Sequence, residues 1–472
     1  MNKFLSILIL LASLQVNAQG YEIKVTLTPF KNQYVYLGSY YGKQLPIVDS
    51  ALLNEKGEAT FKGNQPLGGG IYLVGYPNKM GFFEILVDKQ QQFSIIADTN
   101  RVLENIRFIN SPDNVLFNNY QRYMQQKGRS MDSAAQLRKA NPESAALKTH
   151  IEKTNDEIKT YRNNILKKEP NSMMAFLLTA MREPDVPPAA QHPGGKYDSA
   201  YAYRYYKDHY WDGVNFFDDR LARTPFFENK LDRYFEQVVV QQPDSIIKEI
   251  DWMMGYASVN EEMQKFLMLK FINRYLNQKY MWEDAIFVHL YQKYLSQKDY
   301  PWLTENGKKT ITDRAYNLMA NIFGSPAADI NLPDSTGKEV SLYSVEAPFT
   351  VVFIWDPTCG HCKEVAPRID SIYQSKWKNL GVKIYAMAKE TEGSKKDWLK
   401  FIGDNKLQWQ HVYYSKEADK ARINAGTPGY SQLYDVQSFP TIYLLDKDKR
   451  IIAKKLAFEQ MDEILDLKLK GK

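Results

Sequence analysis

The feature that most constrains the fold is an apolar run, residues 349–355, which leads almost directly into two cysteines. An apolar run of this length is typical of a central strand that is covered on both faces. Beyond the cysteines, apolar residues recur at helical spacing, for example at Val365, Ile369 and Ile372. The pattern predicts a strand followed by a helix, with Cys359 at or just before the helix N-terminus.

The cysteine content indicates chemistry rather than a structural disulfide. Cys359 and Cys362 are the only cysteines among the 472 residues. A structural disulfide contributes more stability when it closes a long loop, and a bond between these two would close almost none. Because a second pair of Cys or His residues at metal-ligand spacing is missing, no zinc site is expected. We therefore predict a redox-active dithiol that needs no metal and no bound cofactor.

The two cysteines are expected to divide the chemistry between them. Backbone N–H groups and the dipole at a helix N-terminus stabilise negative charge, so the Cys359 thiol is expected to have a lowered pKa and to be partly exposed. Cys359 would attack a client disulfide, and Cys362, which points inward one turn later, would then displace the client. His361 is expected to place a positive charge or a hydrogen-bond donor near the Cys359 thiolate, which makes the disulfide more oxidising.

The hydrophobic pattern changes twice along the chain, which predicts three folded domains. A chain of 472 residues is too long for one ordinary core. Residues 19–110 alternate short β-rich runs with turns, as is typical of a β-sandwich. Residues 111–324 carry apolar side chains at helical spacing and are predicted to be all-helical. Residues 325–472 combine strands and helices in an α/β order.

The N-terminus has the pattern of a secretory signal peptide over residues 1–18. Lys3 supplies a positive charge, residues 4–14 form a near-continuous apolar run, and small residues precede a cleavage site after Ala18. The run is too short to span a bilayer, and no cysteine follows it that could carry a lipid anchor. The alternative is a buried N-terminal helix or strand. We predict an exported, periplasmic protein that is not a lipoprotein.

The charge pattern argues against one class of function, and a cluster of aromatic residues allows two interpretations. The formal net charge is +6, but the chain has no block of Lys and Arg residues of the kind that follows a phosphate backbone. Nucleic-acid binding is therefore not expected. A cluster of aromatic residues at 201–211 would suit either a sugar- or peptide-binding surface or an aromatic-rich helix in the core, and the second interpretation is favoured.

Residues 326–472 resemble the thioredoxin superfamily, and in particular its exported TlpA/ResA-like branch. The resemblance rests on the Cys-Gly-His-Cys run after an apolar strand, on Pro367, and on Phe439-Pro440 before a further strand. It implies a thioredoxin-like fold and thiol–disulfide exchange with client proteins. In the family, the proline that matches Pro440 is cis, lies beside the active disulfide, and follows a backbone segment that pairs with the substrate. The residues implied to face the substrate are Trp355, Thr358, Phe439 and Pro440.

The chain departs from the family pattern at three positions. Thioredoxins have a buried Asp six residues before the first cysteine, where this chain has Phe353. The ResA-like branch often has Glu three residues after the second cysteine, where Val365 stands, with Glu364 one place earlier. Thr358 replaces the usual aromatic residue before the first cysteine, which is expected to alter substrate docking. The group that moves protons to and from Cys362 is therefore left open.

The segments before residue 325 look like the two domains of unknown function that often precede such modules in Bacteroidetes-type proteins, and that likeness assigns them no chemistry. The resemblance implies an exported enzyme that exchanges disulfides with client proteins, as a reductase or an isomerase. A membrane protein would supply its electrons. The alternative is a non-enzymatic binding or envelope-sensing protein that uses its thioredoxin-like part as an interaction module. The intact dithiol favours the enzyme.

Overall fold

The computed structural model describes residues 20–79, 81–392 and 395–470. The chain forms two compact units, one of Met1–Val240 with Ile250–Leu267 and the other of Gln241–Glu249 with Met268–Lys472. The predicted signal peptide lies outside the described residues. Within those residues, no helix is both long enough and apolar enough to cross a bilayer.

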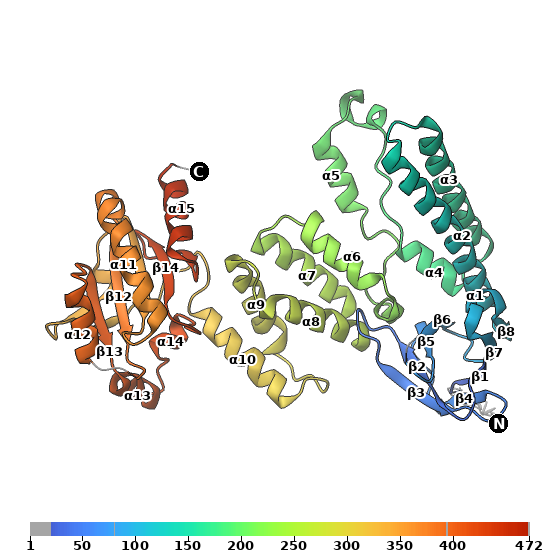
Figure 1. Ribbon diagram of the computed structural model, residues 1–472, viewed down its shortest axis with the longest axis horizontal. Coiled ribbons are helices and arrows are strands. Elements are labelled where there is room, and N and C mark those ends of the chain that lie inside the picture. Colours follow the sequence, from blue (N-terminus) through green and yellow to red (C-terminus); the bar gives the residue numbers. More distant parts are fainter. Residues whose placement is uncertain (1–19, 80, 393–394, 471–472) are drawn as a thin grey trace, which may run out of the picture. The chain divides into compact units, whose positions relative to one another are not determined.

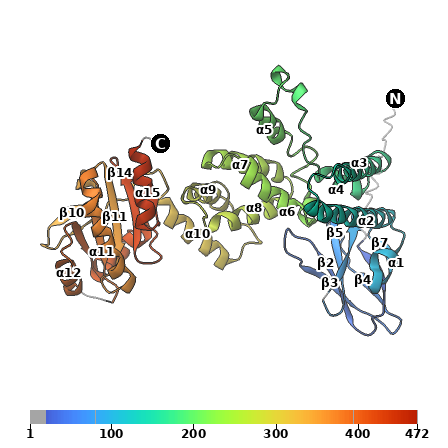
Figure 2. The same ribbon diagram turned by 45° about the horizontal axis from the view of Figure 1, so that its top comes forward.

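The first unit begins with a β-sandwich, whose strands have blue tones in Figures 1 and 2. Its strands are β1 (Glu22–Thr28), β2 (Tyr34–Ser39), β3 (Ile47–Leu52), β4 (Glu58–Lys62), β5 (Gly70–Gly75), β6 (Phe82–Val87), β7 (Gln92–Asp98) and β8 (Arg107–Ile109). One sheet has the order β4-β1-β7-β8 and the other the order β3-β2-β5-β6. Alternate residues of β1, such as Ile23 and Val25, share one apolar core with Val35 and Ile85 of the opposite sheet. The alternating pattern therefore predicted this region correctly.

The middle of the chain is helical, as its apolar spacing predicts. Its helices are α1 (Val102–Asn105), α2 (Pro112–Ala140), α3 (Ala145–Lys168), α4 (Met173–Ala180), α5 (Ser199–Asp208), α6 (Phe227–Arg233), α7 (Pro243–Ala257), α8 (Glu261–Leu276), α9 (Asp284–Leu290) and α10 (Glu305–Met319). The Asn114 side chain of α2 exchanges two hydrogen bonds with the backbone of Leu86, which ties α2 to the sandwich. Tyr210 and Trp211 are core residues in edge-to-face contact, whereas Tyr203 is exposed.

The C-terminal part is an α/β domain built on a five-stranded sheet of order β13-β12-β11-β14-β15. Its strands are β9 (Asn331–Pro333), β10 (Glu339–Ser341), β11 (Phe349–Trp355), β12 (Lys383–Lys389), β13 (Gln410–Tyr414), β14 (Thr441–Asp446) and β15 (Ile451–Lys454). Its helices are α11 (Gly360–Ser375), α12 (Lys395–Asp404), α13 (Lys416–Asn424), α14 (Tyr430–Leu433) and α15 (Phe458–Leu469). β11 is central and pairs in parallel with β12 and antiparallel with β14. This mixed sheet with helices is the thioredoxin-like fold that the resemblance implies.

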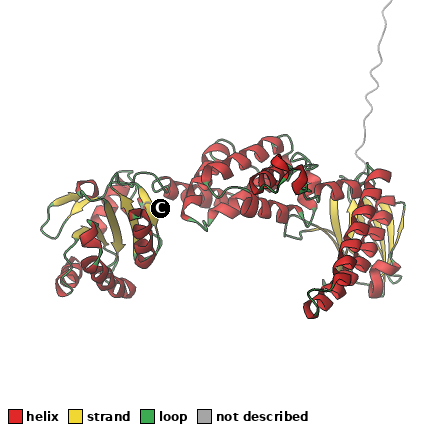
Figure 3. Ribbon diagram, turned by 90° about the horizontal axis from the view of Figure 1, so that it is seen from above, coloured by secondary structure: helices red, strands yellow, loops and turns green. Residues whose placement is uncertain are grey.

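The continuous apolar character of β11 follows from its position between two cores. Val351 and Phe353 face a core that also contains residues of α11 and α15. Val352 and Ile354 face the opposite core, which includes residues of the segment before β11 and of α14. Figure 3 shows the strands of this domain with helices around them. Because both faces of β11 are covered, no polar side chain interrupts the run apart from the buried Thr350.

Candidate active site

Cys359 lies where the central strand ends and α11 begins. It is the N-cap residue of α11 and has an extended backbone conformation. Its Sγ atom accepts a hydrogen bond from the backbone N–H of Cys362 at 3.5 Å and lies 3.9 Å from the carbonyl oxygen of Phe439. The first N–H groups of a helix have no partner within the helix, so they stabilise a sulfur anion at this position.

Cys362 has a different environment, although it is only one helical turn away. Both cysteines are free thiols, but Cys359 is partly exposed whereas Cys362 is 0% exposed and packs in the core beneath α11. Burial is the main cause that raises the pKa of the Cys362 thiol well above its ordinary value, and a backbone hydrogen bond from Asp356 acts in the opposite direction. Cys362 therefore holds its proton, and Cys359 is the sulfur that a client can reach.

The loop before β14 forms the other side of the site. The peptide bond between Phe439 and Pro440 is cis, as the resemblance implies, and β14 begins at the following residue. Both residues line a cleft of about 470 Å³, together with His361 and Arg368 of α11. Because the carbonyl oxygen of Phe439 lies beside the Cys359 sulfur, this cleft borders the reactive thiol. It is the place where a client chain could lie against the dithiol.

His361 lies on the surface of α11, on the rim of this cleft. Its side chain is largely exposed, and its Nδ1 atom lies 3.8 Å from a carboxylate oxygen of the exposed Glu364. In the described structure it forms no hydrogen bond with Cys359, so its electrostatic role stays a prediction. Among the described residues, no group of three or more His, Cys, Asp or Glu side chains could hold a metal ion.

Trp355 does not lie where the family resemblance implies. It is the last residue of β11, is 0% exposed, and stacks on Phe353 with ring centroids 5.9 Å apart. The expectation that it faces a client is not supported by this position, because the alternation along β11 directs Trp355 into the core beneath α11. Its role here is packing. Thr358, by contrast, is exposed next to Cys359.

Asp356 is a site residue that the sequence reasoning missed. Its carboxylate is buried and accepts hydrogen bonds from the N–H and the hydroxyl of Thr358, each at 2.7 Å, and from the hydroxyl of Thr391. Its backbone carbonyl accepts a bond from the N–H of Cys359 at 3.2 Å, and its charge contributes to the raised pKa of Cys362. The available signal was an Asp-x-Thr pattern, typical of a side-chain-capped turn, directly after the central strand.

Three family models match successive parts of the chain. Residues 323–454 match the AhpC/TSA family. Residues 21–117 match a domain of unknown function, DUF4369, and residues 143–320 match another, DUF5106. The AhpC/TSA match thus covers the α/β domain as far as the end of β15, including the dithiol, and α15 lies beyond it.

A part of the chain is also similar to proteins named as thiol-disulfide oxidoreductases. It is 28% identical to ResA of Bacillus cereus over 144 residues, which is 30% of this chain and 74% of that protein. It is 27% identical to ResA of Bacillus anthracis over 148 residues, 31% of this chain and 76% of that protein.

Two solved structures are also similar to a part of the chain. One is a domain of a possible thiol-disulfide isomerase from Cytophaga hutchinsonii, 31% identical, covering 32% of this chain and 97% of its own, with a TM-score of 0.27. The other is the thioredoxin domain of a thiol-disulfide oxidoreductase from Bacteroides vulgatus, 26% identical, covering 30% of this chain and 95% of its own, with a TM-score of 0.27. Together with the family match, the curated relatives show that the C-terminal part of the chain is a thioredoxin-like oxidoreductase domain of the AhpC/TSA family, preceded by two domains of unknown function.

Proposed function

We propose that the protein is an exported thiol–disulfide oxidoreductase that exchanges disulfides with client proteins through Cys359 and Cys362. The observation that carries the proposal is the unequal exposure of the two sulfurs. Cys359 is partly exposed at the N-terminus of α11, and Cys362 is buried within hydrogen-bonding reach of it. This arrangement suits a nucleophile that meets the client and a second thiol that resolves the intermediate.

The proposed reduction proceeds in two balanced exchange steps. The Cys359 thiolate attacks one sulfur of a client disulfide, so that the client S–S bond breaks, a mixed disulfide forms, and the other client sulfur leaves as a thiolate that takes up a proton. Cys362 then loses its proton and attacks the sulfur of Cys359, which releases the second client thiol. Two electrons have passed from the dithiol to the client, and Cys359 and Cys362 are joined by a disulfide.

The direction of electron transfer and the identity of the partner proteins are taken from the resemblance and form part of the proposal. A reductase needs a donor that returns two electrons to the disulfide, and we assign this role to a membrane electron-donor protein. An isomerase needs no net electrons, because the mixed disulfide is resolved by another thiol of the same client. The pattern of residues 1–18 supports export to the periplasm, where disulfides of client proteins persist.

The proposal is tested by reduction of insulin with dithiothreitol, followed as turbidity. The wild-type protein should accelerate the reaction, and Cys359→Ser should abolish the acceleration because the attacking sulfur is lost. Cys362→Ser should instead accumulate a mixed disulfide with the client, which a non-reducing gel and mass spectrometry detect. Equal turbidity rates for the wild type and Cys359→Ser would overturn the proposal.

That negative outcome would favour the second candidate function, a binding or envelope-sensing protein. The observation in favour of this candidate is the large share of the chain, residues 20–320, that lies outside the thioredoxin-like domain. In that case the thioredoxin-like domain would contact partners without exchanging disulfides. A trapped client in the Cys362→Ser variant argues against it, because covalent capture requires an active Cys359.

A further inference from the structure

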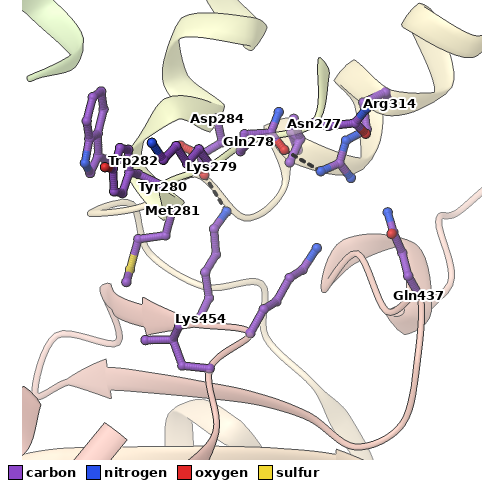
Figure 4. Close-up of a pocket in the computed structure, with 13 residues that line it drawn as sticks. Asn277, Gln278, Lys279, Tyr280, Met281, Trp282, Asp284, Arg314, Gln437 and Lys454 are labelled. Carbon is purple, nitrogen blue, oxygen red and sulfur yellow. Dashed lines mark hydrogen bonds and ion pairs between the residues drawn. The ribbon is translucent and has the colours of Figure 1, made fainter. Parts of the chain in front are cut away.

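A second cleft adjoins the redox site within the second unit. Its volume is about 640 Å³, and Figure 4 shows the side chains that line it. We call it the basic cleft, and it is lined by Asn277–Trp282, Asp284 and Arg314 from the helical region and by Gln437 and Lys454–Leu456 from the α/β domain. Gln437, Lys455 and Leu456 also line the cleft that contains Phe439 and Pro440. A chain that lies along Phe439 can therefore continue into the basic cleft.

Buried ion pairs hold the two walls of the basic cleft together. Lys454, which is 5% exposed, pairs with Asp284 of α9 and donates to Oδ1 of Asn321 at 3.0 Å. Asp435, which is 2% exposed, accepts from Arg314 of α10 at 2.6 Å and also pairs with Lys455. Because these contacts join the helical region to the α/β domain, the cleft is preformed. Binding of a ligand therefore costs little free energy for ordering the walls of the cleft.

The lining of the basic cleft carries an excess of positive charge. The cations are Lys279, Arg314, Lys454 and Lys455, and the carboxylates Asp284 and Asp435 pair with the last three of them. The buried Glu283, whose carboxylate accepts bonds from backbone N–H groups at 2.6 and 3.0 Å, is a third negative charge near these cations. When Glu283 is counted as well, one positive charge remains in excess. Lys279 is exposed, and its ammonium forms no ion pair with any described residue but lies 5.4 Å from the centroid of the Tyr280 ring. An acidic ligand complements this charge.

The same wall presents flat aromatic surface beside the Lys279 ammonium. The rings of Tyr280 and Trp282 are stacked, with centroids 5.7 Å apart and planes at 3°. Tyr280 is 47% exposed, and both side chains lie along the wall of the cleft in Figure 4. Exposed aromatic residues next to a cation are typical anchors for a peptide, since they offer contact area at low entropic cost.

We propose that the basic cleft binds an acidic segment of the client polypeptide whose disulfide Cys359 attacks. This inference rests on the proposed function and adds to it the class of client that is preferred. Lys279, Tyr280 and Trp282 lie in the region that matches DUF5106, so the proposal also gives that region a role in client recognition. The client residues near the disulfide lie against Phe439, and the acidic residues of the client reach Lys279.

The test uses the full chain and three disulfide probes. Two are disulfide-bridged peptides of equal length that differ only in a run of Glu or Gln residues beside the cysteine. The third is a dipyridyl disulfide, a small neutral probe that reports on the dithiol alone. Lys279→Glu should raise KM for the Glu peptide roughly fivefold, because an attraction becomes a repulsion, and should leave the Gln peptide and the dipyridyl disulfide unchanged. Lys447→Glu, an equal charge change at an exposed turn residue outside both clefts, should leave all three unchanged.

A second variant tests the aromatic wall. Trp282→Ala should raise KM for both peptides and leave the rate with the dipyridyl disulfide at the wild-type value, which also shows that the domain remains folded. If Lys279→Glu affects the Glu and Gln peptides equally, or neither, the inference fails while the proposed function stands. If the wild type reduces none of the three probes, the proposed function fails. A dimer in sedimentation that Lys279→Glu dissociates would overturn the inference, because a second copy would then occupy the cleft.

Discussion

The buried Cys362 thiol must lose its proton before it can resolve a mixed disulfide, and the charge of one carboxylate, that of Asp356, acts on it. Burial raises the pKa of Cys362, so water at neutral pH is a poor acceptor for this proton. Neither position at which related proteins carry an acidic residue is acidic here, since Phe353 and Val365 occupy them. Asp356 is buried, and its charge acts on Cys362. We therefore expect Asp356 to accept the proton of Cys362 during resolution.

Asp356→Asn should slow the release of a client from the mixed disulfide by about a hundredfold at neutral pH, a typical loss when a general base is removed. Asn retains an oxygen that can accept from Thr358, so the local turn should persist. The measurement is the rate of client release after rapid mixing of the reduced variant with a disulfide peptide. Thr358→Val is the control for the hydrogen bonds alone, since it removes one donor to Asp356 and keeps the carboxylate.

A faster release of the client from the mixed disulfide in Asp356→Asn would be equally informative. If Asp356 acts only through its charge, its removal lowers the pKa of Cys362 and release becomes faster. Faster or unchanged release in Asp356→Asn would therefore contradict a role in proton transfer.

At the scale of single elements, the sequence predicted the strand and helix around the dithiol well. The apolar run became β11, and the helical spacing after it became α11 with Cys359 at its N-terminus. These elements are predictable because each has a strong local pattern, namely burial on both faces and apolar residues at intervals of three and four.

The same patterns could not determine which way each side chain faces. An apolar run has no period-two signal, so nothing local indicates that Trp355 turns into the core beneath α11. The environment of Asp356 depends on Thr391, which is 35 residues away in the sequence. Such contacts are set by tertiary packing, and a single sequence does not show them.

β13 carries a buried histidine that should make this edge of the sheet sensitive to acid. His411 is 6% exposed and stacks on Trp409 with centroids 5.5 Å apart, and burial lowers its pKa to about 4. In the unfolded chain an imidazole has a pKa of about 6.5. Between these two values the unfolded state binds more protons, so stability falls as the pH decreases, by up to about 1.4 kcal/mol per pH unit.

His411→Phe should remove this dependence and keep the ring on Trp409. Backbone hydrogen exchange of β13, measured by mass spectrometry and corrected for intrinsic rates, should lose more protection between pH 7 and pH 5 in the wild type than in the variant. His150→Gln, a substitution of an exposed histidine in α3, should behave like the wild type. Equal losses of protection in the wild type and His411→Phe would show that His411 does not cause the acid sensitivity.

At the scale of the whole molecule, the sequence predicts a domain boundary near residue 324. The structure joins the regions on the two sides of this boundary. One compact unit contains both the α/β domain and the preceding residues from Met268. The pair of Asp284 and Lys454 links them across 170 residues of sequence, and both side chains are buried. A change of hydrophobic pattern marks where the chain changes its secondary structure, but it does not reveal an ion pair of this sequence separation.

Breaking this pair should therefore destabilise both parts of the unit together. Asp284→Asn leaves the Lys454 ammonium buried without its carboxylate, which costs about 3–5 kcal/mol in comparable pairs, while Asn can still accept from the N–H of Phe323. Lys454→Met removes the charge as well, so the double variant should lose less stability than the sum of the two single variants. Hydrogen exchange should rise in α9 and β15 alike in Asp284→Asn.

Asp313→Asn and Lys309→Met, which break an exposed pair on α10, should each cost about 1 kcal/mol or less. Exchange that rises in α9 alone would show that the pair does not couple the helical residues to the sheet, and the preformed basic cleft would lose its structural basis.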